Sequence, residues 1–300
     1  MKVFVTGPGG YIGGSVAARL VEAGHRVRGL VRSPERADAV RRFGIEPVLG
    51  SLDDGGLLAA EAGQADAVVN AASSDHRGAV EAFVGALAGS GKALLHTSGS
   101  SIVGDDARGE FSDTVFEEDT PVAPTGGRAA RVAIDRFVVG AAERGVRSAV
   151  LCNTLIYGTG LGPHADSIQI PALVRQAVRS GVPRHVGRGL NVWSTVHIDD
   201  VADLYRLVLE NPEARGFMFV ENGEASFRDM VGAIGRRLGL GEPQAWPIED
   251  AIREWGPDRA TYALGSNSRV RGRRARALGW APRHASVLDW IAREMPVAGG

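Results

Sequence analysis

Short apolar runs alternate with longer stretches of helical periodicity along the first half of the chain. Runs typical of strands lie at residues 3–6, 27–31, 47–49, 67–70, 93–97 and 148–151. Stretches with the apolar spacing of amphipathic helices lie at 13–23, 35–42, 57–62, 77–88 and 128–144. Parallel strands need helical crossovers, and those helices cover both faces of a sheet. The alternation therefore predicts an α/β fold with a doubly wound parallel sheet.

The alternation changes after residue 157. A loop, a helix and an extended segment are predicted there, at 158–163, about 171–180 and 192–197. Asp199 is the predicted N-cap of a helix that ends near Leu209. A strand at 217–220 is then expected to rejoin the sheet.

The C-terminal part contains further helical patterns. Ser226 is expected to cap a helix over 227–238, and a last helix is expected near 271–278. These elements divide the chain into a sheet domain and a smaller C-terminal substrate-binding cap. The sheet domain is assigned to 1–155, rejoined by about 195–222, and the cap to 156–194 and 223–300.

Composition excludes several classes of protein. With 44% hydrophobic residues in 300, the chain can bury a large core, and its formal net charge of −1 gives no general attraction to nucleic acid or anionic lipid. Its single cysteine, Cys152, excludes a disulfide framework and cysteine-based metal clusters, and no metal is expected. The sequence contains no signal-like segment and no apolar run of about 18 residues. We expect a soluble cytoplasmic protein with a small-molecule substrate, no nucleic-acid or membrane partner, and a homodimer left open.

A glycine-rich turn follows the first predicted strand. Gly7, Gly10 and Gly13 have the G-x-x-G-x-x-G spacing and lie between that strand and the first helix. At such a turn, backbone N–H groups and the helix dipole can hold a pyrophosphate, and glycine lets the backbone approach it closely. A tight turn without a ligand is the alternative. The context favours a Rossmann-type dinucleotide site, whose expected contacts are Thr6, Gly7, Gly10, Tyr11, Ile12 and Gly13.

Arginines follow the second predicted strand, where a site specific for NAD presents an acidic residue to the adenosine ribose. This segment contains Arg32, Ser33 and Arg36, which offer two guanidinium groups and a hydroxyl. These groups suit the 2′-phosphate that distinguishes NADP from NAD. Solvated arginines at a strand end are the alternative. We expect the cofactor to be NADP(H).

Further motifs cover nearly the whole chain, and together with the glycine turn they resemble the extended short-chain dehydrogenase/reductase superfamily. The motifs are Gly50-Ser51-Leu52-Asp53, Val68-Val69-Asn70-Ala71-Ala72, His96-Thr97-Ser98-Gly99-Ser100, Leu155-Ile156-Tyr157-Gly158, Val196-His197-Ile198-Asp199-Asp200-Val201-Ala202 and Leu278-Gly279-Trp280-Ala281-Pro282. This superfamily includes nucleotide-sugar epimerases and dehydratases and NADP-dependent reductases. The resemblance implies more cofactor-lining residues, namely Ser51, Leu52, Ala71, Ala72, Ser73, Thr97, Asn153 and Ile156.

The superfamily's catalytic residues are missing at the positions that the resemblance assigns to them. Asp135 matches the acidic residue of the Y-x-x-x-K helix, which places Gly127 at the tyrosine position and Arg131 at the lysine position. The position of the catalytic hydroxyl falls on Gly99. Arg131 can hold the ribose hydroxyls of the cofactor, but a guanidinium cannot release a proton as tyrosine does. The chain thus resembles atypical NADP-binding members with a degenerate catalytic tetrad.

A reduction needs a proton for the atom that becomes anionic, so other side chains are candidates for its donor. Asp75 and His76 follow the fourth strand; the alternative is that Asp75 caps a helix and His76 is exposed. Tyr157 follows the sixth strand, and its ring could instead pack under the cofactor. Ser98 could bond a substrate carbonyl or the nicotinamide amide. The expected catalytic residues are Asp75, His76, Tyr157 and Ser98.

Other polar side chains are assigned to structure. His164 is expected to be exposed, and His197 is expected to join the cap to the core. A run of arginines is interpreted as a solvated helix face, although its first member could reach the cleft, and an anionic substrate or nucleic acid is the alternative. The run consists of Arg269, Arg271, Arg273, Arg274 and Arg276.

Two classes of function fit these patterns. The first is an NADPH-dependent reductase of a small carbonyl or imine compound with a non-standard proton donor. Within the enzyme class, a nucleotide-sugar epimerase or dehydratase is the alternative, opposed by Arg32 and by the missing tyrosine and lysine. The second class is a non-catalytic NADP-binding redox sensor.

Overall fold

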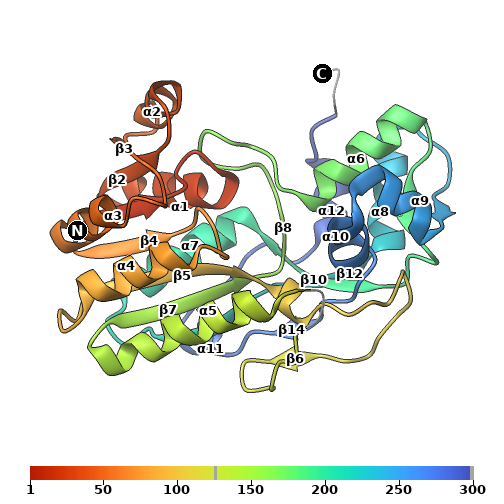
Figure 1. Ribbon diagram of the computed structural model, residues 1–300. Helices are drawn as coiled ribbons and strands as arrows, with labels where there is room; N and C mark the ends of the chain where they lie inside the picture. Colours follow the sequence, from red (N-terminus) through yellow and green to blue (C-terminus); the bar gives the residue numbers. More distant parts are fainter. Residues whose placement is uncertain (125–126, 298–300) are drawn as a thin grey trace.

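Seven strands form the central sheet in the order β11-β7-β5-β4-β1-β2-β3, and every neighbouring pair is parallel (Figure 1). A computed structural model describes residues 1–124 and 127–297. The strands of this sheet are β1 (Lys2–Thr6), β2 (Arg26–Val31), β3 (Glu46–Leu49), β4 (Ala67–Asn70), β5 (Ala93–Gly99), β7 (Arg147–Asn153) and β11 (Gly216–Val220). The predicted doubly wound α/β fold is confirmed, and the strand predicted at 217–220 lies at the edge of the sheet.

Helices cover both faces of this sheet. The face that packs against one helical layer carries Val3 and Val5, whereas Phe4 between them faces the opposite layer, as the two-residue period of a strand requires. The first layer contains α1 (Tyr11–Glu22), α2 (Pro34–Arg41) and α7 (Ile198–Glu210). The second contains α3 (Gly55–Gln64), α4 (Arg77–Leu87) and α5 (Ala129–Gly140).

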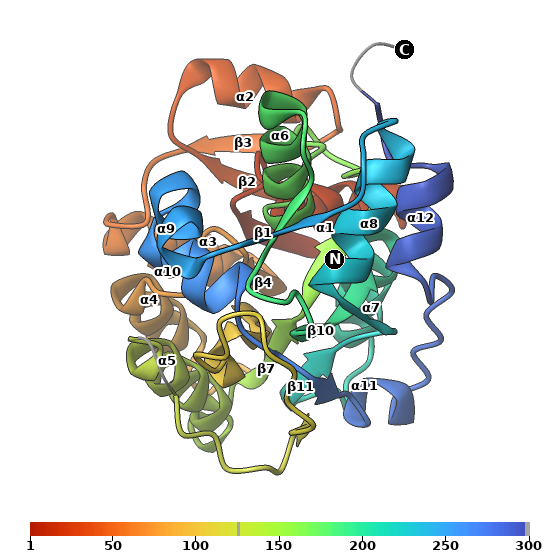
Figure 2. The ribbon, with the colours of Figure 1, turned by 90° about the vertical axis from the view of Figure 1, so that its right-hand side faces the viewer.

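A second hydrophobic core lies beyond the carboxyl end of the sheet, at the right of Figure 1 and facing the viewer in Figure 2. Its three-stranded sheet has the order β12-β10-β8, and two strand pairs, β9 with β13 and β6 with β14, lie outside the central sheet. The strands are β6 (Phe116–Glu117), β8 (Leu155–Tyr157), β9 (Arg184–Val186), β10 (Val192–His197), β12 (Glu224–Ser226), β13 (Gln244–Trp246) and β14 (Val270–Arg271). The remaining helices are α6 (Gln169–Ser180), α8 (Phe227–Arg237), α9 (Ile248–Trp255), α10 (Pro257–Arg259), α11 (Arg274–Ala277) and α12 (Val287–Arg293). Residues 298–300 of the predicted cap lie outside the described residues.

Several predicted boundaries are wrong by a few residues or more. The helix predicted over 128–144 ends at Gly140 and continues as a 3-10 turn. The helix predicted near 271–278 is shorter, because Val270–Arg271 pairs with Phe116–Glu117 and the helix begins only at Arg274. Ser226 caps α8 as predicted.

The N-cap of α7 is His197, not Asp199 as predicted. The Nδ1 atom of His197 accepts a hydrogen bond from the backbone N–H of Asp199 at 3.2 Å. Asp199 therefore lies inside the first turn, where its carboxylate meets the positive end of the helix dipole. The expected structural role of His197 agrees with this contact and with its ring stacking on His284, with centroids 3.9 Å apart.

The structure shows the state of the single cysteine and the character of the helices. Cys152 is a free, buried thiol on β7. In the described part of the chain, no helix has the length and apolar character needed to cross a bilayer.

Candidate functional site

A pocket of about 390 Å³ opens at the carboxyl ends of the first four strands in chain order. It brings together ten predicted site residues, namely Gly7, Gly10, Arg32, Arg36, Ser51, Leu52, Ala71, Ala72, Ser73 and His76. Gly9, Leu30, Val31 and Asp53 also line it, and the sequence interpretation missed them. Asp53 could have been found, because it directly follows the predicted pair Ser51-Leu52 after β3.

The three glycines of the motif differ in the atoms that a side chain at each position would contact. Gly7 has φ +72°, and a Cβ there would lie 2.8 Å from the Cα of Ala72. A Cβ at Gly13 would lie 2.3 Å from the carbonyl oxygen of Gly7, so these two positions need glycine for the turn itself. Gly10 differs, because a Cβ there would meet only the Gly7 oxygen, at 3.4 Å. Gly10 therefore leaves the pocket open at the N-terminus of α1, where unpaired N–H groups favour an anion.

The side chains of Thr6 and Tyr11 form hydrogen bonds that connect the glycine turn to neighbouring segments. The Oγ1 atom of Thr6 is buried, donates to Asn70 Oδ1 at 2.7 Å, and accepts from the backbone N–H groups of Ala71 and Ala72 at 3.1 Å. The hydroxyl of Tyr11 donates to the carbonyl oxygen of Gly158 at 2.8 Å. Ile12, Gly13 and Ser33 are also absent from the pocket lining, and Ser33 caps α2 instead. These predicted residues shape the pocket without lining it.

Three predicted cofactor residues near the ends of β5, β7 and β8 have internal partners. Thr97 Oγ1 lies 2.8 Å from the hydroxyl of Tyr205, to which Asn153 Nδ2 donates at 3.2 Å. Ile156 belongs to the core that α1 and α7 cover. None of the three lines the pocket, so their contact with a cofactor stays a prediction.

Arg32 and Arg36 lie exposed at one end of the pocket. Neither guanidinium forms an ion pair within residues 1–124 and 127–297. Two unpaired cations that line the pocket can bind a phosphate with charge-assisted hydrogen bonds.

His76 lies at the pocket wall beside the segment that follows β3. Its Nδ1 atom accepts from the backbone N–H of Ala79 at 3.0 Å, so His76 caps α4 and the alternative with Asp75 as the cap is wrong. Its Nε2 atom lies 3.0 Å from Asp53 Oδ1, and this hydrogen bond lowers the pKa of Asp53. Both ring nitrogens are thus engaged, and the proposed role of His76 as a proton donor has no support from this geometry.

Asp75 forms a bidentate ion pair with Arg131. Its two carboxylate oxygens accept from Nε at 2.8 Å and from a terminal nitrogen at 2.6 Å, while the other terminal nitrogen donates to Ser101 Oγ at 3.1 Å. These hydrogen bonds lower the pKa of Asp75. Asp75 is therefore ionised at neutral pH, and the role of general acid does not fit it. The salt bridge instead fixes the direction of the Arg131 guanidinium.

Ser98 belongs to a buried polar cluster that the sequence interpretation missed. Its hydroxyl donates to Asp135 Oδ2 at 2.7 Å, and Ser98 and Asp135 are each 3% exposed. Burial raises the pKa of Asp135 to about 7. The Nε2 atom of the buried His96 lies 3.8 Å from Asp135 Oδ1, and among the described residues neither atom has a hydrogen-bond partner. The sequence contained one signal of this cluster, namely His96 inside the apolar run of β5.

Tyr157 points into the second core and not toward the pocket. It is 1% exposed, its hydroxyl donates to the carbonyl oxygen of His284 at 3.0 Å, and its ring meets the edge of His197 with centroids 5.1 Å apart. The expectation that it faces the cofactor cleft is therefore wrong. The side of β8 on which its ring lies packs against the C-terminal helices.

Tyr157→Phe should lower the free energy of unfolding by about 1 kcal/mol, because one buried hydrogen bond is lost, and should leave the rate of any dinucleotide-dependent oxidoreduction unchanged. The carbonyl of His284 keeps a donor, Asn222 Nδ2, at 3.0 Å. Single-turnover absorbance and urea unfolding measure the two quantities. A large loss of rate with unchanged stability would restore Tyr157 as a catalytic candidate.

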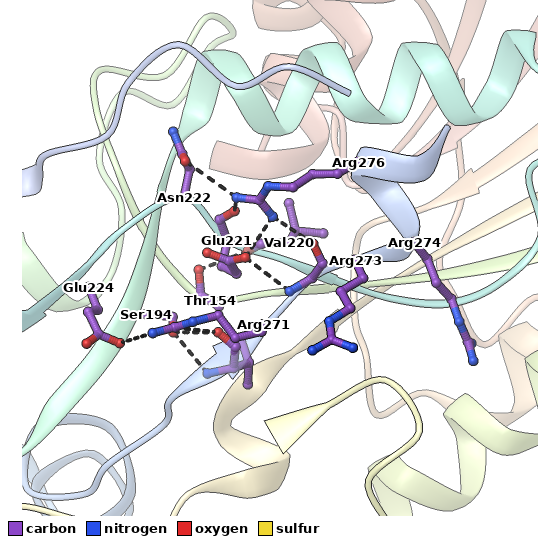
Figure 3. Close-up of polar contacts among 12 residues, drawn as sticks. Thr154, Ser194, Val220, Glu221, Asn222, Glu224, Arg271, Arg273, Arg274 and Arg276 are labelled. Atoms are coloured by element: carbon purple, nitrogen blue, oxygen red, sulfur yellow. Dashed lines mark hydrogen bonds and ion pairs between the residues drawn. The ribbon is translucent and has the colours of Figure 1, made fainter. Parts of the chain in front are cut away.

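The C-terminal arginines do not share the one helix face that was predicted, because Arg271 ends β14 and only Arg274 and Arg276 lie on α11. Four of the five side chains are 38–75% exposed, as expected of solvated arginines, and each of the five has an acidic partner. Figure 3 shows Arg276 beside Glu221, to whose carboxylate it donates at 2.7 Å, and Arg271 reaching Glu224 at 3.0 Å. Arg269 also binds Glu224, while Arg273 pairs with Glu117 and Arg274 with Asp119. Four carboxylates thus offset most of the positive charge of the five arginines.

The chain matches a family model over most of its length and curated relatives over nearly all of it. The family described as NAD dependent epimerase/dehydratase family matches residues 3–218. Oxidase ucsJ of Acremonium sp is 33% identical over 94% of this chain and 92% of its own. The 4-hydroxy-2-methyl-3-oxo-4-farnesyl-3,4-dihydroquinoline-1-oxide ketoreductase of Stigmatella aurantiaca is 27% identical over 100% of this chain and 98% of its own.

Solved structures share the fold. DesIV, a dTDP-glucose 4,6-dehydratase of Streptomyces venezuelae solved with NAD and TYD bound, is 21% identical and has a TM-score of 0.76, covering 98% of this chain and 95% of its own. The matched family spans the glycine turn, the central sheet and the arginine-bearing helix α5. The chain therefore belongs to the NAD-dependent epimerase/dehydratase family.

Proposed function

We propose that the protein is an NADPH-dependent oxidoreductase that reduces a small carbonyl or imine compound. The observation that carries the proposal is the pocket in which the open Gly10 position and two unpaired arginines occur together. The ketoreductase relative, which aligns over the whole chain, supports the reaction class. Family membership supports a nicotinamide dinucleotide as cofactor.

The described residues fit such a cofactor. The N-terminus of α1 and the glycine turn would hold the pyrophosphate, Ser51, Leu52 and Asp53 would flank the adenine, and Arg32 with Arg36 would bind a 2′-phosphate. Bound there, reduced nicotinamide supplies a hydride to the substrate. The chain's part is to align the substrate with the cofactor and to stabilise the charge that develops on the substrate.

Arg32→Asp should reverse the cofactor preference from NADPH to NADH. Each guanidinium that binds the extra phosphate in good geometry contributes roughly 1.5–3 kcal/mol, and an aspartate would repel it while accepting from the ribose hydroxyl. Fluorescence titration of both cofactors against both proteins measures the preference. Equal dissociation constants in the unmutated protein would contradict the proposed phosphate site.

Single-turnover oxidation of bound NADPH with a panel of aldehydes, ketones and imines tests the reaction. Loss of NADPH absorbance with formation of the alcohol or amine is the expected result. Tight NADPH binding with no oxidation by any member of the panel would favour the redox-sensor alternative. An epimerase or dehydratase would instead return its dinucleotide unchanged after each turnover of a sugar nucleotide.

A further inference from the structure

Arg131 has N–H donors that no described residue binds. A guanidinium carries five N–H donors. Two of them bind Asp75 and one binds Ser101, which leaves two N–H groups of Arg131 without an acceptor among the described residues. The Arg131 side chain is only 16% exposed, so these donors face a partly dehydrated space.

Two glycine positions near Arg131, in the fold or along the chain, carry no side chain. A Cβ at Gly99 would lie 3.8 Å from a terminal nitrogen of Arg131, and a Cβ at Gly127 would have no described atom within 4 Å. Gly99 ends β5, and Gly127 precedes α5, four residues before Arg131 along the chain. At Gly99, therefore, no side chain stands against the guanidinium, and a ligand atom at that place would be within van der Waals contact of its terminal nitrogen.

The site lies next to the dinucleotide pocket. Asp75, which holds Arg131, is two residues beyond Ser73, and Ser73 lines the pocket. Asp75 lies between Ser73 and His76, both of which line the pocket, so a substrate at Arg131 would be close to that pocket. Asp75 fixes the guanidinium in advance, so no reorganisation is needed when charge develops on the substrate.

We propose that Arg131 binds the carbonyl oxygen of the substrate and stabilises the negative charge that develops on it, an inference that rests on the proposed reductase function. The carbonyl carbon gains the hydride, and the π electron pair of the C=O bond moves to the oxygen, which the terminal N–H of Arg131 holds. A water molecule then protonates this oxygen and leaves hydroxide to the buffer. Arg131 supplies no proton, because a guanidinium does not deprotonate in proteins.

This role can be separated from the holding of ribose hydroxyls. A residue that only holds the ribose raises the NADPH dissociation constant when it is removed, and it leaves the rate at saturating NADPH unchanged. A residue that stabilises the oxyanion lowers that saturated rate, and loss of one such donor typically costs about 10²–10³ in rate.

The test compares Arg131→Ala and Arg131→Lys with Arg19→Ala. Arg19 is a matched control, because its side chain is 18% exposed and pairs with Asp203, away from the pocket lining. Single-turnover rates at saturating NADPH are measured with and without guanidinium chloride at non-denaturing concentration. The NADPH dissociation constant is measured separately by fluorescence. Calorimetry then follows the binding of formate, a small oxyanion probe, to each protein in the presence of NADP.

We expect Arg131→Ala to lose about 10²–10³ in the saturated rate, with a smaller change in NADPH affinity. Added guanidinium should restore part of the rate, formate binding should disappear, and Arg131→Lys should keep the fold with an intermediate rate. A retained saturated rate in both Arg131 variants, or unchanged formate binding, overturns the assignment and leaves the reductase proposal intact. If the unmutated protein oxidises NADPH with no carbonyl but with an imine, only the Arg131 assignment falls; if it oxidises NADPH with neither, both proposals fall together.

Discussion

Gly10→Val should lower the affinity for NADPH by more than about 100-fold while the protein stays folded, because its side chain would occupy the place of the pyrophosphate. The backbone at Gly10 has φ −98° and ψ 174°, which valine adopts without strain. The nearest atom to a Cβ there is the carbonyl oxygen of Gly7, at 3.4 Å. The valine side chain would therefore extend into the space that we assign to the ligand, and it would not enter the core. Fluorescence titration with NADPH and circular dichroism measure binding and folding.

Two other glycines serve as controls for this result. Gly63→Val on α3, where a Cβ meets nothing within 4 Å, should change neither binding nor folding. Gly13→Ala should disturb the turn itself, because its Cβ would lie 2.3 Å from the Gly7 carbonyl oxygen. If Gly10→Val unfolds the protein as Gly13→Ala does, Gly10 is needed for the turn and carries no information about a ligand.

Strands and crossovers could be predicted because their patterns are local. In the run Val3-Phe4-Val5, the two valines pack against one helical layer and the phenylalanine packs against the other. Each later strand of the sheet is also a short apolar run, and helical segments separate these runs along the chain. Helix starts were less predictable. Two helices, α4 and α7, are capped by the Nδ1 atoms of His76 and His197, and capping preferences favour Ser, Thr, Asp and Asn instead.

The dinucleotide pocket could be predicted for a similar reason. Its lining follows the ends of parallel strands, which meet at one edge of the sheet, so positions after each strand are enough to identify it. The catalytic candidates depend on side-chain direction, which spacing does not determine. The partner of Asp75 is Arg131, 56 positions away, and the direction of Tyr157 depends on the core that packs against β8.

Asp135→Asn should stabilise the protein progressively relative to the unmutated chain as the pH rises from about 4 to 7, by up to about 4 kcal/mol. Burial raises the folded-state pKa of Asp135 from 3.8 to about 7. Between these values the folded protein binds a proton that the unfolded chain has already released, so the unmutated protein loses stability as the pH rises through this window. Asparagine keeps the shape of the side chain and an oxygen for the Ser98 hydroxyl, but it has no proton to lose.

Urea unfolding at several pH values between 4 and 8 measures this difference. The free-energy gap between Asp135→Asn and the unmutated protein should widen with pH and become constant above about pH 7, where the buried carboxylate has ionised. Asp113→Asn, which changes an exposed carboxylate, should show no such widening. A constant gap for Asp135→Asn would mean that the Ser98 hydroxyl and the Arg131 guanidinium stabilise the carboxylate against the cost of burial, and that the proton leaves Asp135 as readily as it leaves a surface side chain.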